Sequence, residues 1–352
     1  METRSVGSLQ ASLAGLGCAS FGWWIDERRS RDVIHAALDA GINFFDCADE
    51  YGEGRAEEYL GRALGSKRHE ALIVTKFAGA KPDDGTPPGS AQWVRHSCER
   101  SLRRLGTDWI DLYLIHHPDP STPISETLEA LKGLQRDGWI REIGCSNLDA
   151  GQLLEAKAAA DALGMGGFRT LECGYSLLDR TAETGIVPLC QDLDMTVLPY
   201  FPLASGMLTG KYRRNEPTAQ AGRMDKYLNG AKVKDYFPAL FTDRSFDVVE
   251  ALDAYARDHG RRLSELALAW IASQSWVGSV ISGATSPAQV RQNVSAIDWK
   301  LSRDECEEVA ALTTTEHAFT WLFGSPSYTS PPPGTDLAAT PRVISVTPGL
   351  QA

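Results

Sequence analysis

Short apolar segments alternate with longer amphipathic segments along most of the chain. The short segments have the length and composition of buried strands, and the longer ones carry apolar residues at helical spacing. The short segments predict eight strands, at Leu13–Gly17, Asn43–Asp46, Leu72–Lys76, Leu112–His116, Glu142–Cys145, Thr170–Gly174, Thr196–Tyr200 and Ser279–Ser282. The longer segments predict helices over Arg31–Ala40, Glu57–Leu64, Gln92–Leu105, Ile124–Asp137, Gly151–Leu163, Glu183–Leu193, Phe246–His259, Leu263–Gln274 and Pro287–Ile297.

Capping residues support several of these boundaries. Ser30 and Asp149 stand where helices are expected to begin, because short polar side chains accept hydrogen bonds from the first backbone N–H groups of a helix. Gly41, Gly138 and Gly164 stand where helices are expected to end, because glycine adopts the left-handed backbone conformation that terminates a helix.

Strands that each precede a helix predict a parallel sheet covered by helices. A closed barrel and an open doubly wound sheet both fit this alternation. The barrel is favoured because no GxGxxG motif follows the first strand, and because polar residues follow many strands, at the end where a barrel holds its active site. We therefore predict one α/β domain, a (β/α)8 TIM barrel over residues 1–312. Residues 211–245 form a long insertion after the seventh strand, and residues 313–352 form a C-terminal tail that covers the barrel mouth or is partly disordered.

Composition narrows the functional class. The formal net charge of −11 argues against binding to nucleic acid or to an anionic membrane. No stretch approaches the roughly 20 apolar residues of a membrane span, and the first residues do not resemble a signal peptide. Seven cysteines lie scattered without a CxxC pair, so we expect reduced thiols, with neither a disulfide framework nor a zinc site. These features predict a soluble cytoplasmic protein, and the oligomeric state is left open.

Four polar side chains lie at, or shortly after, the ends of three neighbouring predicted strands. The segment FFDCADEYGEG carries Asp46 and Tyr51, IVTKF carries Lys76, and DLYLIHHPD carries His116. Neighbouring parallel strands lie about 4.8 Å apart, so these side chains can converge on one point. A lysine ammonium beside a tyrosine favours the phenolate and lowers its pKa, which makes the phenol a better proton donor to a carbonyl oxygen. In this arrangement Asp46 keeps Lys76 charged, and His116 holds the carbonyl.

The neighbouring histidine serves as an internal comparison. If the strand continues, alternation directs the side chain of His117 to the face opposite His116. We therefore assign the chemistry to His116, and at most a supporting role in the pocket to His117.

The four motifs together resemble the aldo-keto reductase family, and the resemblance extends from about Leu13 to Leu312. It implies that Asp46, Tyr51, Lys76 and His116 form a catalytic tetrad. It also implies a nicotinamide dinucleotide cofactor, NADP or NAD, bound without a Rossmann fold. The cofactor-binding residues implied by the matching motifs are Ser146, Asn147, Glu172, Tyr200, Phe201, Pro202, Leu203, Ser205, Gly206, Lys211, Gly283, Thr285, Ser286, Gln289, Arg291, Gln292 and Asn293.

The resemblance assigns these residues to three parts of the cofactor. Ser146 and Asn147 hold the carboxamide, and Tyr200 stacks on the nicotinamide ring. The segment from Phe201 to Gly206 runs beside the pyrophosphate, and Lys211 supplies its counter-charge. The motif ISGATSPAQVRQN binds the adenosine end, where it opens a helix whose N-terminus attracts phosphate.

Four positions depart from the family pattern. Glu172 stands where a glutamine is usual, and an ionised carboxylate there favours the positively charged oxidised ring. Phe201 replaces a small polar residue, and Gln292 replaces a frequent glutamate. Thr285 stands where many members have a basic residue, and Arg291 or a residue of the 211–245 insertion can supply the missing charge for a 2′-phosphate. We predict NADP, with NAD as the alternative.

The sequence predicts reduction of an aldehyde or ketone but does not identify the substrate. Aromatic residues suited to line a pocket for it are Trp23, Trp24, Trp93, Trp321 and Phe323. Three alternatives stay open. The enzyme works in the alcohol-oxidising direction, it reduces a keto-sugar as a tailoring enzyme, or it is a cofactor-binding, redox-sensing accessory subunit similar to potassium-channel β subunits.

Overall fold

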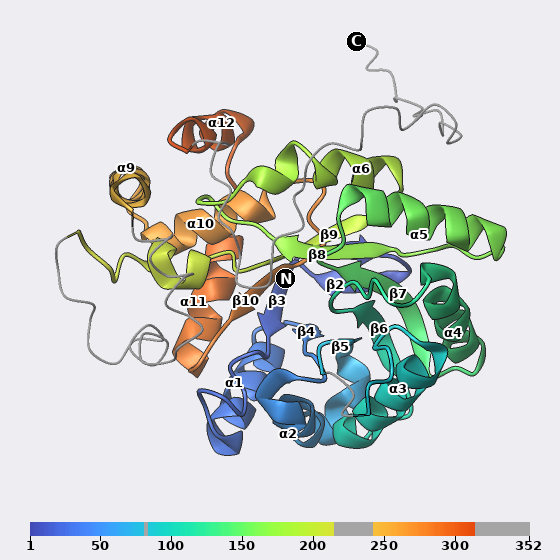
Figure 1. The fold of residues 1–352 in the computed structure, drawn as a ribbon. Coiled ribbons are helices and arrows are strands. Elements are labelled where there is room, and N and C mark those ends of the chain that lie inside the picture. The colour runs from blue at the N-terminus through green and yellow to red at the C-terminus, as the bar shows by residue number, and fades with distance from the viewer. Residues whose placement is uncertain (81–83, 215–241, 314–352) are drawn as a thin grey trace, which may run out of the picture.

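The computed structural model describes residues 1–80, 84–214 and 242–313. Eight parallel strands form one sheet in the order β10-β3-β4-β5-β6-β7-β8-β9. Their bounds are Ala14–Gly17 (β3), Phe44–Asp46 (β4), Leu72–Phe77 (β5), Ile110–Ile115 (β6), Ile140–Ser146 (β7), Thr170–Gly174 (β8), Thr196–Tyr200 (β9) and Val280–Gly283 (β10). Figure 1 shows these strands curling into a ring with helices around its outside. The predicted (β/α)8 barrel is confirmed.

The helices outside the ring follow the strands in alternation. They are α1 (Glu27–Asp39), α2 (Arg55–Leu64), α3 (Ala91–Leu105), α4 (Ile124–Arg136), α5 (Ala150–Ala162), α6 (Ile186–Asp192), α9 (Asp243–Asp258), α10 (Leu263–Ala272), α11 (Pro287–Ile297) and α12 (Arg303–Ala311). Four short 3₁₀ helices complete the described elements: η1 (Tyr51–Gly54), η2 (Gly65–Glu70), η3 (Thr181–Glu183) and η4 (Ala204–Thr209). Most predicted boundaries lie within a few residues of the observed ones. The strand β6 ends at Ile115, so His116 and His117 both follow it.

The ring closes between β9 and β10, the two end strands of the sheet. They are joined through an isolated bridge between Val197 and Val277, and the Gly278 N–H donates a 3.0 Å hydrogen bond to the Val197 carbonyl. The other neighbouring strands of the sheet share at least two register pairs each. The barrel therefore has a seam where the hydrogen-bonded ladder is shortest.

An antiparallel hairpin precedes the barrel, formed by β1 (Thr3–Val6) and β2 (Leu9–Ser12). Its apolar side chains belong to the same buried cluster as inward-facing strand residues, and the cluster comprises Val6, Leu9, Ala11, Phe44, Val74, Leu112, Leu114, Leu198 and Ile281. The hairpin thus packs against the apolar interior of the ring, near the centre of the view in Figure 1. The sequence analysis did not predict it.

The capping predictions are mostly correct. Asp149 caps α5 with a capping box, and Gly41, Gly138 and Gly164 all have positive φ. The prediction for Ser30 is wrong, because α1 begins at Glu27 and Asp26 caps it. The first turn of α1 is exposed and polar, so the apolar periodicity starts one turn late.

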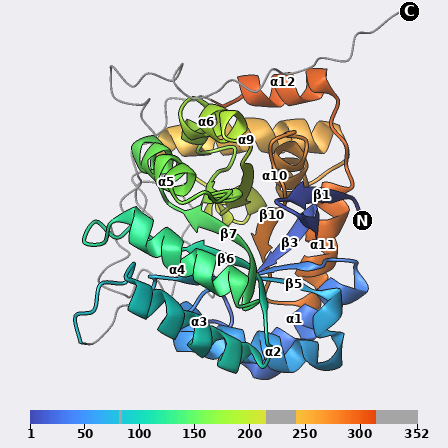
Figure 2. The same ribbon diagram turned by 90° about the vertical axis from the view of Figure 1, so that its right-hand side faces the viewer.

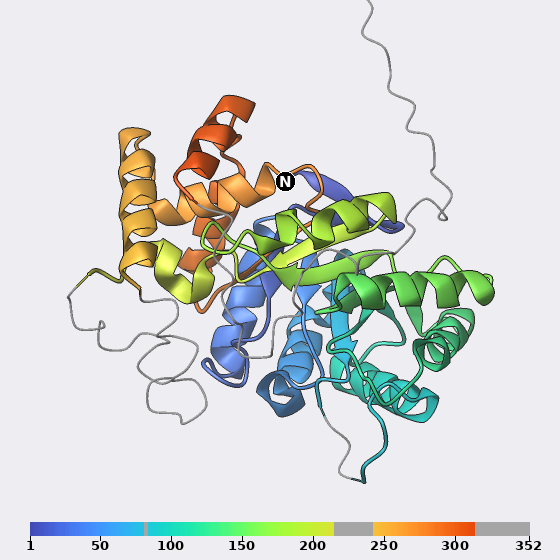
Figure 3. The ribbon, with the colours of Figure 1, turned by 45° about the horizontal axis from the view of Figure 1, so that its top comes forward.

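Two described helices, α9 and α12, are additional to the alternating strand-helix pattern. Both lie near α10. Figures 2 and 3 show them stacked on one side of the molecule. The indole N–H of Trp270 in α10 donates a 3.1 Å hydrogen bond to the Cys306 carbonyl in α12. The sequence analysis did not predict α12, in which only Val309 is buried.

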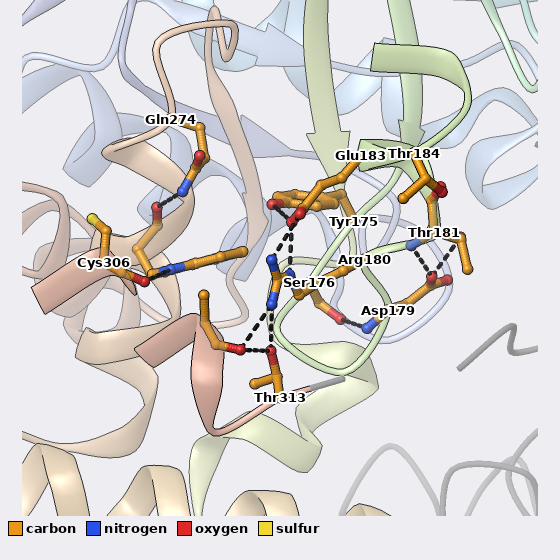
Figure 4. Close-up of polar contacts among 12 residues, drawn as sticks. Tyr175, Ser176, Asp179, Arg180, Thr181, Glu183, Thr184, Gln274, Cys306 and Thr313 are labelled. Atoms are coloured by element: carbon orange, nitrogen blue, oxygen red, sulfur yellow. Dashed lines mark hydrogen bonds and ion pairs between the residues drawn. The ribbon is translucent and has the colours of Figure 1, made fainter. Parts of the chain in front are cut away.

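A half-buried arginine connects this side of the molecule to the loop after β8. Arg180 makes a two-pronged pair with Glu183, with both N–O distances at 2.7 Å, and its guanidinium lies 5.2 Å from the Trp270 ring centroid. It also donates hydrogen bonds to the Ala310 carbonyl at 2.9 Å and to the Thr313 hydroxyl at 2.8 Å. Figure 4 shows Arg180 at the centre of these contacts. This side chain holds the end of α12 to the barrel.

Two predicted segments lie wholly or largely outside the described residues. They are the 211–245 insertion, of which residues 215–241 are not described, and the tail after residue 313. All seven cysteines are described, and all are free thiols. Among the helices of the described ranges, none has the length and apolar character needed to span a bilayer.

We expect Arg180→Ala to lower the free energy of unfolding by about 2–3 kcal/mol, because it leaves the partly buried Glu183 carboxylate without its charged partner and with only the Tyr175 hydroxyl among the side chains that the structure shows bonded to it. Denaturant unfolding followed by circular dichroism measures the change. The matched control is Arg303→Ala, which removes an exposed pair with Glu307 on α12 and is expected to change stability by less than about 0.5 kcal/mol. Equal effects of the two substitutions would contradict a connecting role for Arg180.

Candidate active site

The candidate site lies in the layer of inward-facing side chains at the carboxyl ends of the strands. Phe44 and Val74 belong to the apolar interior of the ring. Asp46 and Lys76 stand two residues further along the same strands, and alternation places them on the same face. The barrel interior therefore changes from apolar to charged within one layer, and the site is built on strand residues whose positions the sheet fixes.

Lys76 is the centre of this charged layer, and its side chain has no exposed surface. Its ammonium makes a very short contact with the Asp46 carboxylate and donates a 2.9 Å hydrogen bond to the Cys47 carbonyl. The Glu172 carboxylate, from β8, lies 3.3 Å from the same nitrogen. Burial alone would lower the pKa of Lys76, but these carboxylates raise it well above the usual range. The lysine is therefore charged at every physiological pH.

Tyr51 follows β4 in a turn that depends on glycine. Its hydroxyl-bearing ring lies with its centroid 5.2 Å from the Lys76 ammonium nitrogen. Gly52 has φ 59°, and a Cβ there would lie 2.5 Å from the Phe21 carbonyl oxygen, so no other residue fits. The turn thus places the phenol beside the lysine, on the same rim of the barrel.

His116 follows β6 and meets the tyrosine from the far side of β5, the strand that carries Lys76. The two ring centroids are 5.8 Å apart in an edge-on arrangement, and the imidazole is 7% exposed. His117 does not point to the opposite side, because β6 ends before it, and its ring stacks on His116 with centroids 4.4 Å apart. Glu50, which the sequence analysis missed, places a carboxylate oxygen 3.4 Å from His116 Nδ1.

Burial shifts the pKa values of the two candidate proton-handling groups in opposite directions. It raises the pKa of Tyr51 well above its usual range, although the Lys76 ammonium acts to lower it. The lowered tyrosine pKa expected from the sequence is therefore wrong, because desolvation outweighs the ammonium. Burial, together with Lys76, lowers the pKa of His116 well below its usual range. The phenol is protonated and the imidazole is neutral.

Two carboxylates share the single ammonium. Burial, reinforced by Asp46, raises the pKa of Glu172 to about 8, and burial also raises the pKa of Asp46 despite the adjacent Lys76. The two acids titrate as a coupled pair, so one proton is held between them near neutral pH. Glu172 Oε2 is buried and receives no well-oriented hydrogen bond from the described residues.

Three further predicted residues form one hydrogen-bonded chain beside this cluster. The Tyr200 hydroxyl donates to Asn147 Oδ1 at 2.7 Å, and Asn147 Nδ2 lies 3.0 Å from the Ser146 hydroxyl oxygen. The Ser146 hydroxyl donates to the Glu172 carbonyl, and Asn147 donates to the His116 carbonyl. The ends of β6, β7, β8 and β9 are thereby tied together at the site.

The loop after β9 has an unusual backbone. Phe201 and Ser205 have positive φ, and Gly206 has φ 100°. A Cβ at Gly206 would lie 2.8 Å from Lys211 Nζ, so the glycine lets the ammonium lie against the main chain. Pro202 is buried and Leu203 is half-buried within this loop. The arrangement leaves a cation next to exposed backbone, as a pyrophosphate site requires.

The residues of the last motif, ISGATSPAQVRQN, lie at the end of β10 and in the first turns of α11. Ser286 caps the helix, and Gln289 accepts from the Thr285 N–H at 2.7 Å. Asn293 is buried and donates to the Ser282 hydroxyl, so it fixes the strand end. Gly283, Gln289, Arg291 and Gln292 are the predicted cofactor residues of this motif that are exposed.

Arg291 is not at this helix start. It lines a hollow between α1 and α11 together with Asp32, His35 and Asp39, where acidic side chains surround it. A different arginine reaches the helix start, because the guanidinium of Arg29 donates a 3.2 Å hydrogen bond to the Thr285 carbonyl. The contact of Arg29 could not be predicted from the sequence, because Arg29 lies on α1, far along the chain from Thr285.

The aromatic residues predicted to line the substrate pocket differ in how far they are exposed to solvent. Trp23 is 53% exposed, whereas Trp93 is buried in the first turn of α3, with Arg100 over its ring. Trp93 therefore serves in packing. Trp321 and Phe323 lie outside the described residues.

Comparison with known proteins agrees with this arrangement. The profile of the aldo/keto reductase family matches residues 14–314. A probable voltage-gated potassium channel subunit beta from Arabidopsis thaliana is 34% identical over 306 residues, covering 85% of this chain and 92% of that protein. Aldo-keto reductase YhdN from Bacillus subtilis is 32% identical over 330 residues, covering 88% and 92%. An NADH-specific methylglyoxal reductase from Escherichia coli is 34% identical over 294 residues, covering 79% and 85%.

A solved structure shows the same fold. The holo form of an aldo-keto reductase from Bacillus halodurans superposes with a TM-score of 0.68 at 30% sequence identity, covering 90% of this chain and 97% of that one. The family match, the barrel and the relatives together show that this chain belongs to the aldo/keto reductase family and is an NAD(P)-dependent oxidoreductase.

Proposed function

We propose that this protein uses NADPH to reduce the carbonyl group of an aldehyde or ketone to an alcohol. The observation that carries the proposal is the buried Lys76 ammonium, held by Asp46 and lying beside the ring of Tyr51. A protonated phenol next to a fixed cation suits proton donation to an oxygen that gains negative charge. Family membership supports the reaction class.

Each member of the tetrad has a distinct role in this proposal. The bound cofactor supplies a hydride to the carbonyl carbon. Tyr51 donates the proton to the carbonyl oxygen, and Lys76 stabilises the phenolate that remains. His116 is neutral, so it can donate a hydrogen bond to the carbonyl without adding charge. Asp46 keeps the ammonium oriented.

The cofactor assignment rests on residues that fit its parts. Glu172 Oε2 lacks a well-oriented hydrogen bond, so it can accept one from the carboxamide NH₂ beside Ser146 and Asn147. Tyr200 offers the ring for stacking, and Lys211 offers the charge for the pyrophosphate. We propose NADP over NAD because Arg29 places a guanidinium at the start of α11, where Thr285 brings no charge. An NADH-specific relative marks NAD as the alternative.

A second function is favoured by one finding. The relative from Arabidopsis thaliana is named as a probable potassium channel β subunit. A redox-sensing accessory subunit would bind the cofactor and turn over slowly. A spectrophotometric screen of NADPH and NADH against aldehydes, ketones and keto-sugars separates the functions, because the accessory subunit would bind NADPH and oxidise it with none of them. The same screen separates a small-carbonyl reductase from a keto-sugar tailoring enzyme.

We expect Tyr51→Phe to reduce the rate of carbonyl reduction by about 10²–10⁴-fold, because the proton donor is lost while the ring is kept. NADPH oxidation with an aldehyde from the screen measures the rate, and fluorescence titration checks that NADPH still binds. Tyr59→Phe, on α2, is the matched control and should turn over like the wild type. Unchanged turnover in Tyr51→Phe would exclude Tyr51 as the acid.

Arg29→Ala should weaken NADPH binding by about ten-fold and leave NADH binding nearly unchanged, because only NADPH carries the 2′-phosphate. Dissociation constants from fluorescence titration give both values. Arg28→Ala removes the adjacent exposed guanidinium and should alter neither constant. A loss of equal size for NADPH and NADH would contradict recognition of the 2′-phosphate by Arg29.

Glu172 provides a pH test that also addresses the oxidative direction. Its pKa is about 8, so the carboxyl is neutral below this pH and negative above it. A negative charge near the nicotinamide favours the positive oxidised ring. The ratio of the NADPH to the NADP⁺ dissociation constant should therefore rise on the order of ten-fold from pH 7 to pH 9, as expected for one added unit charge near the ring. In Glu172→Gln the ratio should stay constant, and a parallel rise in both proteins would refute the assignment.

A further inference from the structure

A second polar cluster lies at the same rim, beside the charged layer. It consists of Glu50, in the loop after β4, and of His116 and His117, which follow β6. Each side chain offers one ligand atom, and the three atoms lie within 4.8 Å of one another. The proposed reduction uses His116 alone among them, so the other two side chains have no part in it.

The buried nitrogen of this cluster lacks a hydrogen-bond partner. His116 Nδ1 has no partner among the described residues, and the nearest carboxylate oxygen, from Glu50, is 3.4 Å away. An imidazole nitrogen without a hydrogen bond keeps a lone pair that can bind a metal ion.

A glycine keeps space open at this nitrogen. A Cβ at Gly79 would lie 2.6 Å from His116 Nδ1, 2.9 Å from the Glu50 carboxyl carbon and 3.1 Å from Asp49 Oδ1. Gly79 is not among the glycines with positive φ, so its backbone conformation does not require glycine. The requirement is therefore spatial, because a methyl group there would fill the gap between the imidazole and the carboxylate.

We propose that Glu50, His116 and His117 bind one divalent transition-metal ion of the zinc class. Two imidazoles and one carboxylate are a common ligand set for such an ion, and they leave a fourth position open to water or to another ligand. Magnesium and calcium are disfavoured, because they prefer oxygen ligands. The proposal does not depend on carbonyl reduction, since the ion binds without cofactor or substrate.

Binding requires a small rearrangement. Bonds of about 2.0–2.2 Å in a tetrahedral site place ligand atoms roughly 3.3–3.6 Å apart. Glu50 Oε1 and His116 Nδ1 are already 3.4 Å apart, so the rearrangement falls mainly on His117. The His117 ring must also turn out of its stack on His116, where the interplanar angle is 10°. Both Glu50 and His117 are only half-buried, which allows these rotations. His116 stays in place, with its carbonyl held by Asn147.

The test is calorimetric titration of the full chain with ZnCl₂, after chelator treatment and without cofactor. We expect one ion per chain. His117→Ala and Glu50→Gln each remove a ligand and should weaken zinc binding at least about ten-fold. Gly79→Ala keeps all three ligands but fills the gap, and it should weaken binding as well. The matched control His69→Ala removes an exposed histidine on η2 and should bind zinc like the wild type.

Two outcomes would overturn the proposal: no stoichiometric binding by the wild type, or wild-type affinity in His117→Ala and Glu50→Gln. Titration with Co²⁺ adds a spectroscopic readout, because nitrogen and oxygen ligands give ligand-field bands without the charge-transfer band of a thiolate. A thiolate band would assign the ion to a cysteine and would also overturn the proposal. Unchanged thermal unfolding of the variants shows that any loss is local. The failure of zinc binding leaves NADPH turnover untouched, so the two proposals fail separately.

Discussion

A fully buried ammonium is the constraint on which the site depends. An unpaired charge in a protein interior costs several kcal/mol, so Lys76 can stay inside the barrel only with its compensating oxygens in place. Asp46, the Cys47 carbonyl and Glu172 supply them from β4, from the loop that follows it and from β8. These groups meet because the ring brings the strand ends together. The closed barrel is therefore a condition for the buried charge.

Desolvation then acts on the neighbours of Lys76 with opposite signs. It disfavours the phenolate of Tyr51 and the imidazolium of His116, and the pKa of the one rises while that of the other falls. Both groups are consequently neutral. Among the described side chains of this layer, charge is carried by the Lys76 ammonium and by the carboxyl pair of Asp46 and Glu172, and one ionised carboxylate is enough to balance the ammonium. Glu172 thus makes the local charge depend on pH, which a glutamine at this position would not do.

Much of the fold could be predicted from the sequence because its signals are local. Short apolar segments and helical stripes predicted the β/α alternation, and polar residues at the strand ends favoured the barrel. The same position at strand ends predicted that Asp46 and Lys76 lie close together. The hairpin of β1 and β2 was missed because each strand has four residues, too few to establish a period. The helix α12 was missed because it buries little, and α1 was started late because its first turn is polar.

The parts of the site that could not be predicted depend on distances between segments remote in the sequence. Strand alternation misplaced His117 because the strand ends one residue before His116. The contact of Glu50 with His116, and that of Arg29 with Thr285, join different β/α units. Burial decides whether the pKa of Tyr51 is raised or lowered, and burial cannot be read from a sequence motif. The roles of the tetrad and of the cofactor residues stay predictions.

The seam between β9 and β10 gives the barrel a mechanical asymmetry. The loop that follows β9 carries Lys211, and the segment that follows β10 opens α11, so the two cofactor motifs lie on opposite sides of the shortest ladder. A dinucleotide long enough to contact both would act as a clamp across that joint, adding to the few hydrogen bonds that close it. Ligand binding and closure of the ring would then be one thermodynamic event, in which the cofactor raises the resistance of the whole barrel to opening.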